Sequence, residues 1–138
     1  MHFDLVDRVL EQGPDRIVTL KHVTAAEEYL QDHFPTFPVL PGVMMLEALV
    51  QAGRRLAEPR AGAPLVLGRV RALKYGKLVK PGASLRVEVS LHKANDDNTF
   101  DMKGEAILLD PAAPAGPEPA VAASGRFLLR PVRVGRFD

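Results

Sequence analysis

The sequence contains no cysteine, no tryptophan and no long apolar run. The absence of cysteine excludes a disulfide scaffold, a thiolate metal site and a cysteine nucleophile, and it fits a reducing compartment such as the cytoplasm. The longest apolar stretch, residues 37–46, is interrupted by prolines and a glycine and is too short to span a membrane. Two aspartates among the first seven residues argue against a secretion signal. A net charge of +1 gives no indication of nucleic-acid binding.

One domain is expected to span residues 1–138, with a mobile loop rich in proline and alanine over 111–119. Alternation of apolar and polar residues predicts strands over 85–91, 100–108 and 121–129, and strands are also predicted over 65–75 and over the β-rich runs 4–11 and 16–23. Asn95-Asp96-Asp97-Asn98 is a hairpin signal between two of these strands. Thr24 and Glu27 have the spacing of a capping box, which predicts a short helix over 25–30.

A long helix is predicted over residues 43–57, because Pro41-Gly42 suits its start and Glu58-Pro59 suits its end. Residues at helical spacing form one buried stripe, namely Leu46, Leu49, Val50, Gly53, Leu56 and Ala57. The first turn is apolar all round, so the first half of the helix is expected to be enclosed on every side. The pattern predicts an α+β fold in which a mostly antiparallel sheet curls around this helix. Edge pairing in a dimer would cover one edge of such a sheet.

Glu47 is a candidate acid, because three of its four neighbours on the helix surface are apolar. A buried carboxylate is usually paired, protonated or functional, and Gln51, one turn later, is placed to hydrogen-bond it. A glutamate that faces solvent is the alternative interpretation.

His33 and Gly42 are the other candidates. Histidine is suited to proton transfer near neutral pH, and His33 lies in a segment whose prolines restrict its path. Gly42 lies at the helix start, where unpaired N–H groups can stabilise an oxyanion. A hydrogen-bonded loop histidine and a simple turn are the alternatives. The other three histidines, His2, His22 and His92, are expected to have no catalytic role.

The stretch HFPTFPVLPGVMMLEALVQ, residues 33–51, resembles the signature of the FabZ/FabA-type 3-hydroxyacyl-acyl-carrier-protein dehydratases. That signature reads roughly H-F-P-G-x-P-V-x-P-G-V-x-x-x-E-A-x-x-Q. The segments LVDRVLE and KYGKLVKPGASLRVEV on either side are also similar to family segments. Thr36 departs from the signature, which has glycine there. Glu47, where FabA-like enzymes generally carry aspartate, indicates that the chain is closer to FabZ.

The resemblance implies a hotdog fold and a homodimer, or a trimer of dimers, with the active site at the dimer interface. His33 of one protomer would be the base and Glu47 of the other the acid. Gly42 would polarise the thioester carbonyl, and Val43 and Gln51 are further substrate-binding positions of the motif. The implied reaction is dehydration of 3-hydroxyacyl-ACP to trans-2-enoyl-ACP in fatty-acid or related biosynthesis. Acid–base catalysis of this kind needs no metal or redox cofactor, and the substrate is carried on the phosphopantetheine of the acyl carrier protein.

Two other functions stay open, a hotdog acyl thioesterase and a non-catalytic acyl-binding or regulatory hotdog protein. The presence of both His33 and Glu47 favours the dehydratase. Basic residues concentrate over 54–80 and 126–136. If folding gathers them, they would attract an acidic carrier protein, and an ordinary solvated surface is the alternative.

Overall fold

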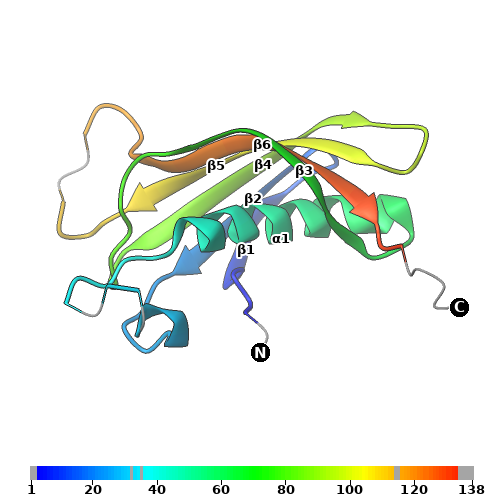
Figure 1. Cartoon of the computed structure of the whole chain (residues 1–138). Coiled ribbons are helices and arrows are strands. Elements are labelled where there is room, and N and C mark those ends of the chain that lie inside the picture. The colour runs from blue at the N-terminus through cyan, green and yellow to red at the C-terminus, as the bar shows by residue number, and fades with distance from the viewer. Residues whose placement is uncertain (1–2, 32, 35, 114–115, 134–138) are drawn as a thin grey trace, which may run out of the picture.

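The computed structural model describes residues 3–31, 33–34, 36–113 and 116–133. Within this part of the chain, six strands form one sheet in the order β1-β2-β4-β5-β6-β3 (Figure 1), and every neighbouring pair is antiparallel. The strands are β1 (Arg8–Gln12), β2 (Arg16–His22), β3 (Leu65–Tyr75), β4 (Ser84–Ala94), β5 (Phe100–Leu109) and β6 (Val121–Pro131). The long helix α1 (Gly42–Ala61) lies between β2 and β3 in the chain, as predicted.

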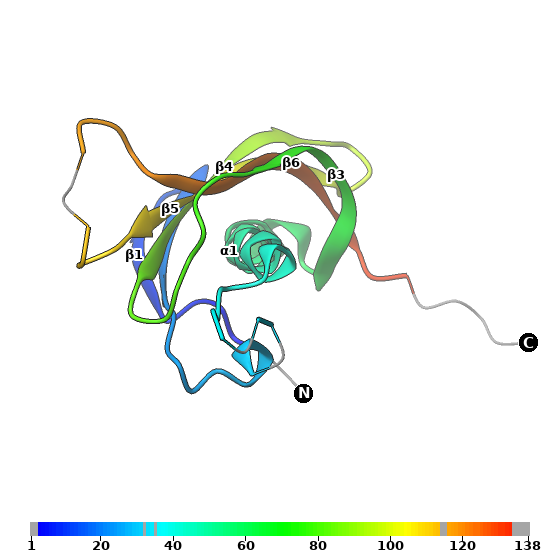
Figure 2. The same ribbon diagram turned by 60° about the vertical axis from the view of Figure 1, so that its left-hand side comes forward.

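The sheet curls around α1, so that the helix lies in the concave side of the sheet (Figure 2). Close packing depends on two glycines. A Cβ atom on Gly104 of β5 would lie 3.2 Å from Leu49 Cδ2, and one on Gly53 of α1 would lie 3.0 Å from the ring of Phe127. Larger residues at these two positions would push the helix away from the sheet. The curved antiparallel sheet around one long helix confirms the predicted α+β architecture.

The helix α1 does not end at Glu58-Pro59, as its sequence predicts, but continues to Ala61 with Pro59 inside its last turn. Proline lacks the N–H that would bond to the carbonyl four residues earlier. That carbonyl, of Arg55, instead lies 3.5 Å from Nε2 of Gln12. The helix ends at Gly62, which has φ of 65° and donates its N–H to the carbonyl of Glu58 at 2.9 Å.

The segments before α1 are less regular than predicted. The first strand covers Arg8–Gln12 instead of 4–11. The short helix predicted over 25–30 is reduced to a single 3-10 turn, η1 (Glu28–Leu30). The carboxylate of Glu27 accepts the N–H of Thr24 at 2.8 Å, as in a capping box, but no side chain caps η1 at its first residue. One half of a capping box therefore forms, without a regular α-helix.

The first half of α1 is not enclosed on every side in this chain, contrary to prediction. Val43 is 68% exposed, and Met44 and Leu46 are only half-buried. The sheet covers one side of these turns and leaves the other side open. Leu46, which was predicted to belong to the buried stripe, is therefore only half-buried, whereas Leu49 is fully buried. In the part of the chain that the structure describes, no helix is long and apolar enough to cross a bilayer.

The predicted loop over 111–119 lies between β5 and β6, and its residues 114–115 fall outside the described part of the chain.

Candidate active site

His33 lies in the connection between η1 and α1, where one hydrogen bond orients its ring. Its Nδ1 lies 2.8 Å from the carbonyl oxygen of Val39. Because a carbonyl oxygen only accepts, Nδ1 carries the proton and Nε2 of the neutral ring keeps a free lone pair. Val39 is buried, and the N–H of the next residue, Leu40, donates to the carbonyl of Val79 at 2.7 Å. The carbonyl that holds His33 therefore belongs to a buried segment tied to Val79, and no hydrogen bond to Nε2 is found among the described residues.

Phe34, next to His33, has an unusual backbone. Its φ of 58° lies in the left-handed region, which costs free energy for a residue with a Cβ atom. The ring of Phe34 lies 4.5 Å from that of His33, between centroids, and its carbonyl accepts the N–H of Phe37. Thr36, where the signature has glycine, is exposed within this turn. Strain of this kind is concentrated in proteins at functional sites.

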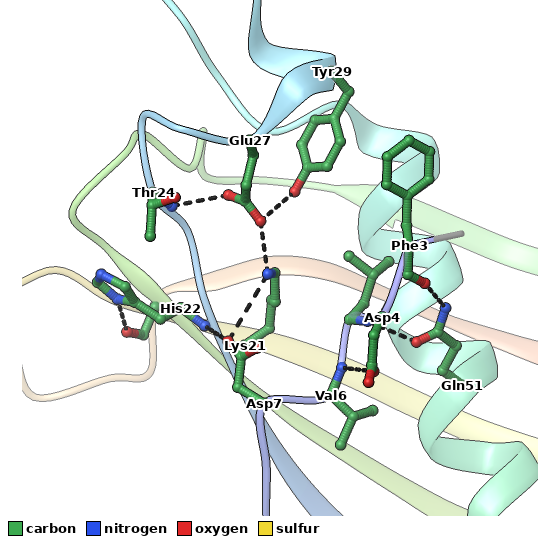
Figure 3. Close-up of polar contacts among 12 residues, drawn as sticks. Phe3, Asp4, Val6, Asp7, Lys21, His22, Thr24, Glu27, Tyr29 and Gln51 are labelled. Carbon is green, nitrogen blue, oxygen red and sulfur yellow. Dashed lines mark hydrogen bonds and ion pairs between the residues drawn. The ribbon is translucent and has the colours of Figure 1, made fainter. Parts of the chain in front are cut away.

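Glu47 is half-buried in the second turn of α1, and Gln51 donates a hydrogen bond to its Oε1 at 3.2 Å. The predicted hydrogen bond between these two residues is present. Gln51 also holds the segment ahead of β1, because its Nε2 donates to the carbonyl of Phe3 and its Oε1 accepts the N–H of Leu5 (Figure 3). These distances are 2.8 and 2.7 Å. This link could not be predicted from local sequence patterns, since it joins positions 46 and 48 residues apart.

A hollow of about 510 Å³ opens beside Glu47, and we call it the Glu47 hollow. One face of α1 forms its floor, with Val43, Met44, Leu46, Glu47, Gln51 and Arg54. Phe3, which lies ahead of β1, and Leu67, which lies in β3, form its walls. It is apolar around Val43 and becomes polar toward Arg54, whose Nε pairs with Oε1 of Glu58 at 2.7 Å. Such a groove can hold an apolar chain with its reactive end at the carboxyl group.

Gly42 is the first residue of α1, after the N-cap residue Pro41. Among the described residues, no acceptor is found for the N–H groups of Gly42 and Val43, as is usual for a first helical turn. The ring of Tyr75, at the end of β3, lies against Gly42, and a Cβ atom there would be 2.9 Å from Tyr75 Cζ. The contact of Tyr75 with Gly42 could not be predicted from the sequence, because a strand pattern carries no information about contacts between distant elements.

The single chain does not bring His33 and Glu47 together. Within the described residues no hydrogen bond or ion pair joins them, and His33 does not line the Glu47 hollow. His22 lies in β2 with its Nδ1 2.9 Å from Ser84 Oγ, and His92 is exposed on β4. His2 lies outside the described residues.

Some of the basic residues gather on the face of the sheet that is turned away from α1. Lys74, Lys103 and Arg126 line a hollow of about 520 Å³ there, together with Glu88 and Glu105. Arg69 and Arg71 line a smaller one beside it. None of these five forms an ion pair with another described residue. No group of three potential metal ligands occurs among the residues that the structure describes.

A family model described as ApeI-like (ApeI dehydratase) matches residues 10–108. The chain belongs to this dehydratase family. One curated relative is the 3-hydroxyacyl-[acyl-carrier-protein] dehydratase FabZ of Oenococcus oeni, which is 44% identical to this chain over 97 residues. The matched residues cover 67% of this chain and 70% of the relative. FabZ of Lactobacillus helveticus is 39% identical over 112 residues, or 78% of this chain and 75% of the relative. The resemblance to FabZ is confirmed.

Solved structures similar to this ApeI-like chain confirm the hotdog fold. The dehydratase heterocomplex ApeI:P from Xenorhabdus doucetiae has a TM-score of 0.64 at 15% identity, covering 93% of this chain and 98% of the other. An acyl-CoA hydrolase from Bacillus cereus has a TM-score of 0.66 at 12% identity, covering 87% of this chain and 67% of the other. At these identities the likeness concerns the fold alone.

Proposed function

We propose that this ApeI-like chain removes water from a 3-hydroxyacyl thioester on an acyl carrier protein and releases the trans-2-enoyl thioester. The observation that carries the proposal is the hydrogen bond from His33 to the Val39 carbonyl, which leaves Nε2 free as a base. The FabZ relatives, whose names give this reaction, support the same conclusion. The hydrolases share the fold alone, so no specific observation favours a thioesterase.

The reaction begins with a proton on C2, which the adjacent thioester carbonyl acidifies. His33 Nε2 takes this proton, and negative charge builds on the thioester oxygen. The N–H groups of Gly42 and Val43 at the start of α1 donate hydrogen bonds to this oxygen. The positive end of the helix dipole lies at the same place and also favours negative charge. One such donor typically contributes about 3–4 kcal/mol to lowering the barrier.

Glu47 completes the elimination. As the C2–C3 double bond forms, the C3–O bond breaks and the hydroxyl leaves as water with a proton from Glu47. The proton taken by His33 returns to Glu47 through solvent. Gln51, which donates to Oε1 of Glu47, keeps the carboxyl group oriented. No metal or redox cofactor takes part in these steps.

The proposal includes a homodimer in which His33 of one protomer faces Glu47 of the other. Their separation within one chain and the open face of α1 around Val43 support it. The reaction would take place in the cytoplasm, in agreement with a sequence that lacks cysteine. The acyl carrier protein is the partner.

Turnover of a short-chain 3-hydroxyacyl-carrier substrate tests the proposal. We expect the conjugated enoyl thioester to form, and His33→Ala and Glu47→Ala each to lower kcat by at least about 100-fold. His92→Ala, which changes an exposed histidine on β4, should leave kcat unchanged. Release of free thiol would indicate a thioesterase, and binding without a product would indicate an acyl-binding protein.

Mixed dimers test the shared site. Co-refolding His33→Ala with Glu47→Ala chains creates mixed dimers in which one of the two sites is intact. Statistical mixing predicts recovery of about a quarter of the parent activity, since about half of the dimers are mixed. No recovery would contradict a site built from two protomers.

A further inference from the structure

The walls of the Glu47 hollow come from distant parts of the chain. Phe3 approaches α1 from the segment ahead of β1, and Leu67 approaches from edge strand β3. A substrate whose 3-hydroxyl group reaches Glu47 has this apolar floor and its two walls beside its acyl chain. Phe3 is the larger of the two and is half-buried against the core. Its ring therefore limits the breadth of what can bind there.

The position of Phe3 is held from two sides. Its carbonyl accepts the hydrogen bond from Gln51, and its ring meets that of Tyr29 edge to face, with centroids 5.4 Å apart at 84°. Tyr29 is held in turn, because its hydroxyl donates to Oε1 of Glu27 at 2.7 Å. Lys21 Nζ lies 2.6 Å from the same carboxylate oxygen (Figure 3). The side chains of Lys21 and Glu27 are only 10% and 15% exposed, so solvent weakens this ion pair little.

We propose that Phe3 is a specificity-determining residue that sets the width of the acyl-binding part of the Glu47 hollow. This inference rests on the proposed function, because it takes the hollow to be the acyl site. A straight acyl chain contacts the ring along its length. A branched or phenyl-bearing chain needs the space that the ring fills. Tyr29 acts as a positioning residue, since it contacts Phe3 and does not line the hollow.

The test compares a straight-chain 3-hydroxyoctanoyl substrate with a 3-hydroxyacyl substrate that ends in a phenyl group. Affinity is measured by calorimetry in the His33→Ala background, and kcat/KM is measured with His33 intact. We expect Phe3→Ala to shift the ratio of the two affinities toward the phenyl substrate by about tenfold or more. Phe3→Leu should give a smaller shift in the same direction, and so should Tyr29→Leu.

Leu109→Ala is the matched control, because Leu109 is 44% exposed at the end of β5 and does not line the hollow. It should leave the ratio unchanged. An equal loss of affinity for both substrates in Phe3→Ala, as general structural damage would cause, would overturn the inference. So would an unchanged ratio, or a parent protein that binds neither acyl chain.

The two readouts separate the inference from the proposed function. If the affinity ratio shifts but no enoyl product forms, Phe3 shapes an acyl site in a protein that is not a dehydratase. If the enoyl product forms but the ratio does not shift, the dehydratase proposal stands and the role of Phe3 is rejected.

Discussion

The ring of Tyr75 occupies the space into which a side chain on Gly42 would project. A Cβ atom on Gly42 would lie 2.9 Å from Cζ, 3.0 Å from Cε1 and 3.2 Å from Cε2 of Tyr75. The residue that starts the helix and the last residue of β3 are therefore coupled. Because Tyr75 is 52% exposed, its ring has room to move if it is pushed.

This coupling predicts a non-additive pair of substitutions. Gly42→Ala should displace the Tyr75 ring across the N-terminus of α1 and lower kcat/KM. In a Tyr75→Ala background the new methyl group meets no ring, so the same change should have a smaller effect, with a coupling of about 1 kcal/mol. Kinetics of the parent, the two single variants and the double variant measure it. Additive losses would mean that Gly42 matters for a reason other than Tyr75.

Gln51→Leu should lower both stability and activity. The variant leaves the carbonyl of Phe3 and the N–H of Leu5 without their partner, which we expect to cost about 2 kcal/mol in free energy of unfolding. It also frees Glu47, so kcat should fall more than KM rises. Gln12→Leu is the matched control, since it removes a long 3.5 Å contact to the Arg55 carbonyl. Equal effects of the two variants on denaturant unfolding would contradict the importance of the Gln51 contacts.

Lys21→Met should destabilise the fold by about 3 kcal/mol, because it leaves the largely buried carboxylate of Glu27 without its cation. Adding Glu27→Gln removes the unpaired charge and should restore part of this loss. Urea unfolding of both variants measures the difference. A double variant no more stable than Lys21→Met would show that the charge of Glu27 is not what makes the single change costly.

Stability should fall at high pH because of Tyr29. Burial, together with its hydrogen bond to the Glu27 carboxylate, raises the pKa of the Tyr29 hydroxyl above its ordinary value of 10.0. The folded chain therefore keeps a proton that the unfolded chain loses, so this contribution is complete below pH 10.0 and is lost as pH rises through the folded pKa. Tyr29→Phe should show a shallower fall in the free energy of unfolding above that pH. Equal slopes for Tyr29→Phe and the parent protein would contradict a contribution of Tyr29 to this pH dependence.

Patterns within a strand or a helix could be read from the sequence, and contacts between elements could not. The strands predicted over 85–91 and 100–108 fall within β4 and β5, because period-two alternation is a local property, and the strand predicted over 65–75 coincides with β3. The end of α1 was misplaced, because Pro59 lies in the last turn of the helix, which continues to the left-handed C-cap at Gly62. The residue pattern predicted an antiparallel sheet curled around one helix, and the resemblance of residues 33–51 to the dehydratase signature implied the hotdog fold.

The candidate site follows the same division. The motif identified His33 and Glu47, and helical spacing indicated the contact between Glu47 and Gln51. Their catalytic roles stay predictions. Alternation and spacing carry no information on Phe3 and Tyr75, which reach α1 from the segment ahead of β1 and from the end of β3. Enclosure of the first turns of α1 was wrongly expected, since apolar composition does not say whether the same chain provides the cover.

A side-chain amide carries an N–H donor beside a carbonyl acceptor, as the edge of a strand does, and has a second N–H for another partner. Gln51 donates to the Phe3 carbonyl and accepts from the Leu5 N–H while also donating to Glu47, and so takes the place of a neighbouring strand for this short extended piece. Pairing of this kind fixes register. Inserting or deleting one residue between Phe3 and Leu5 would turn the Phe3 ring to the opposite side of the segment. The spacing of these residues, as well as their identity, is therefore built into the shape of the Glu47 hollow.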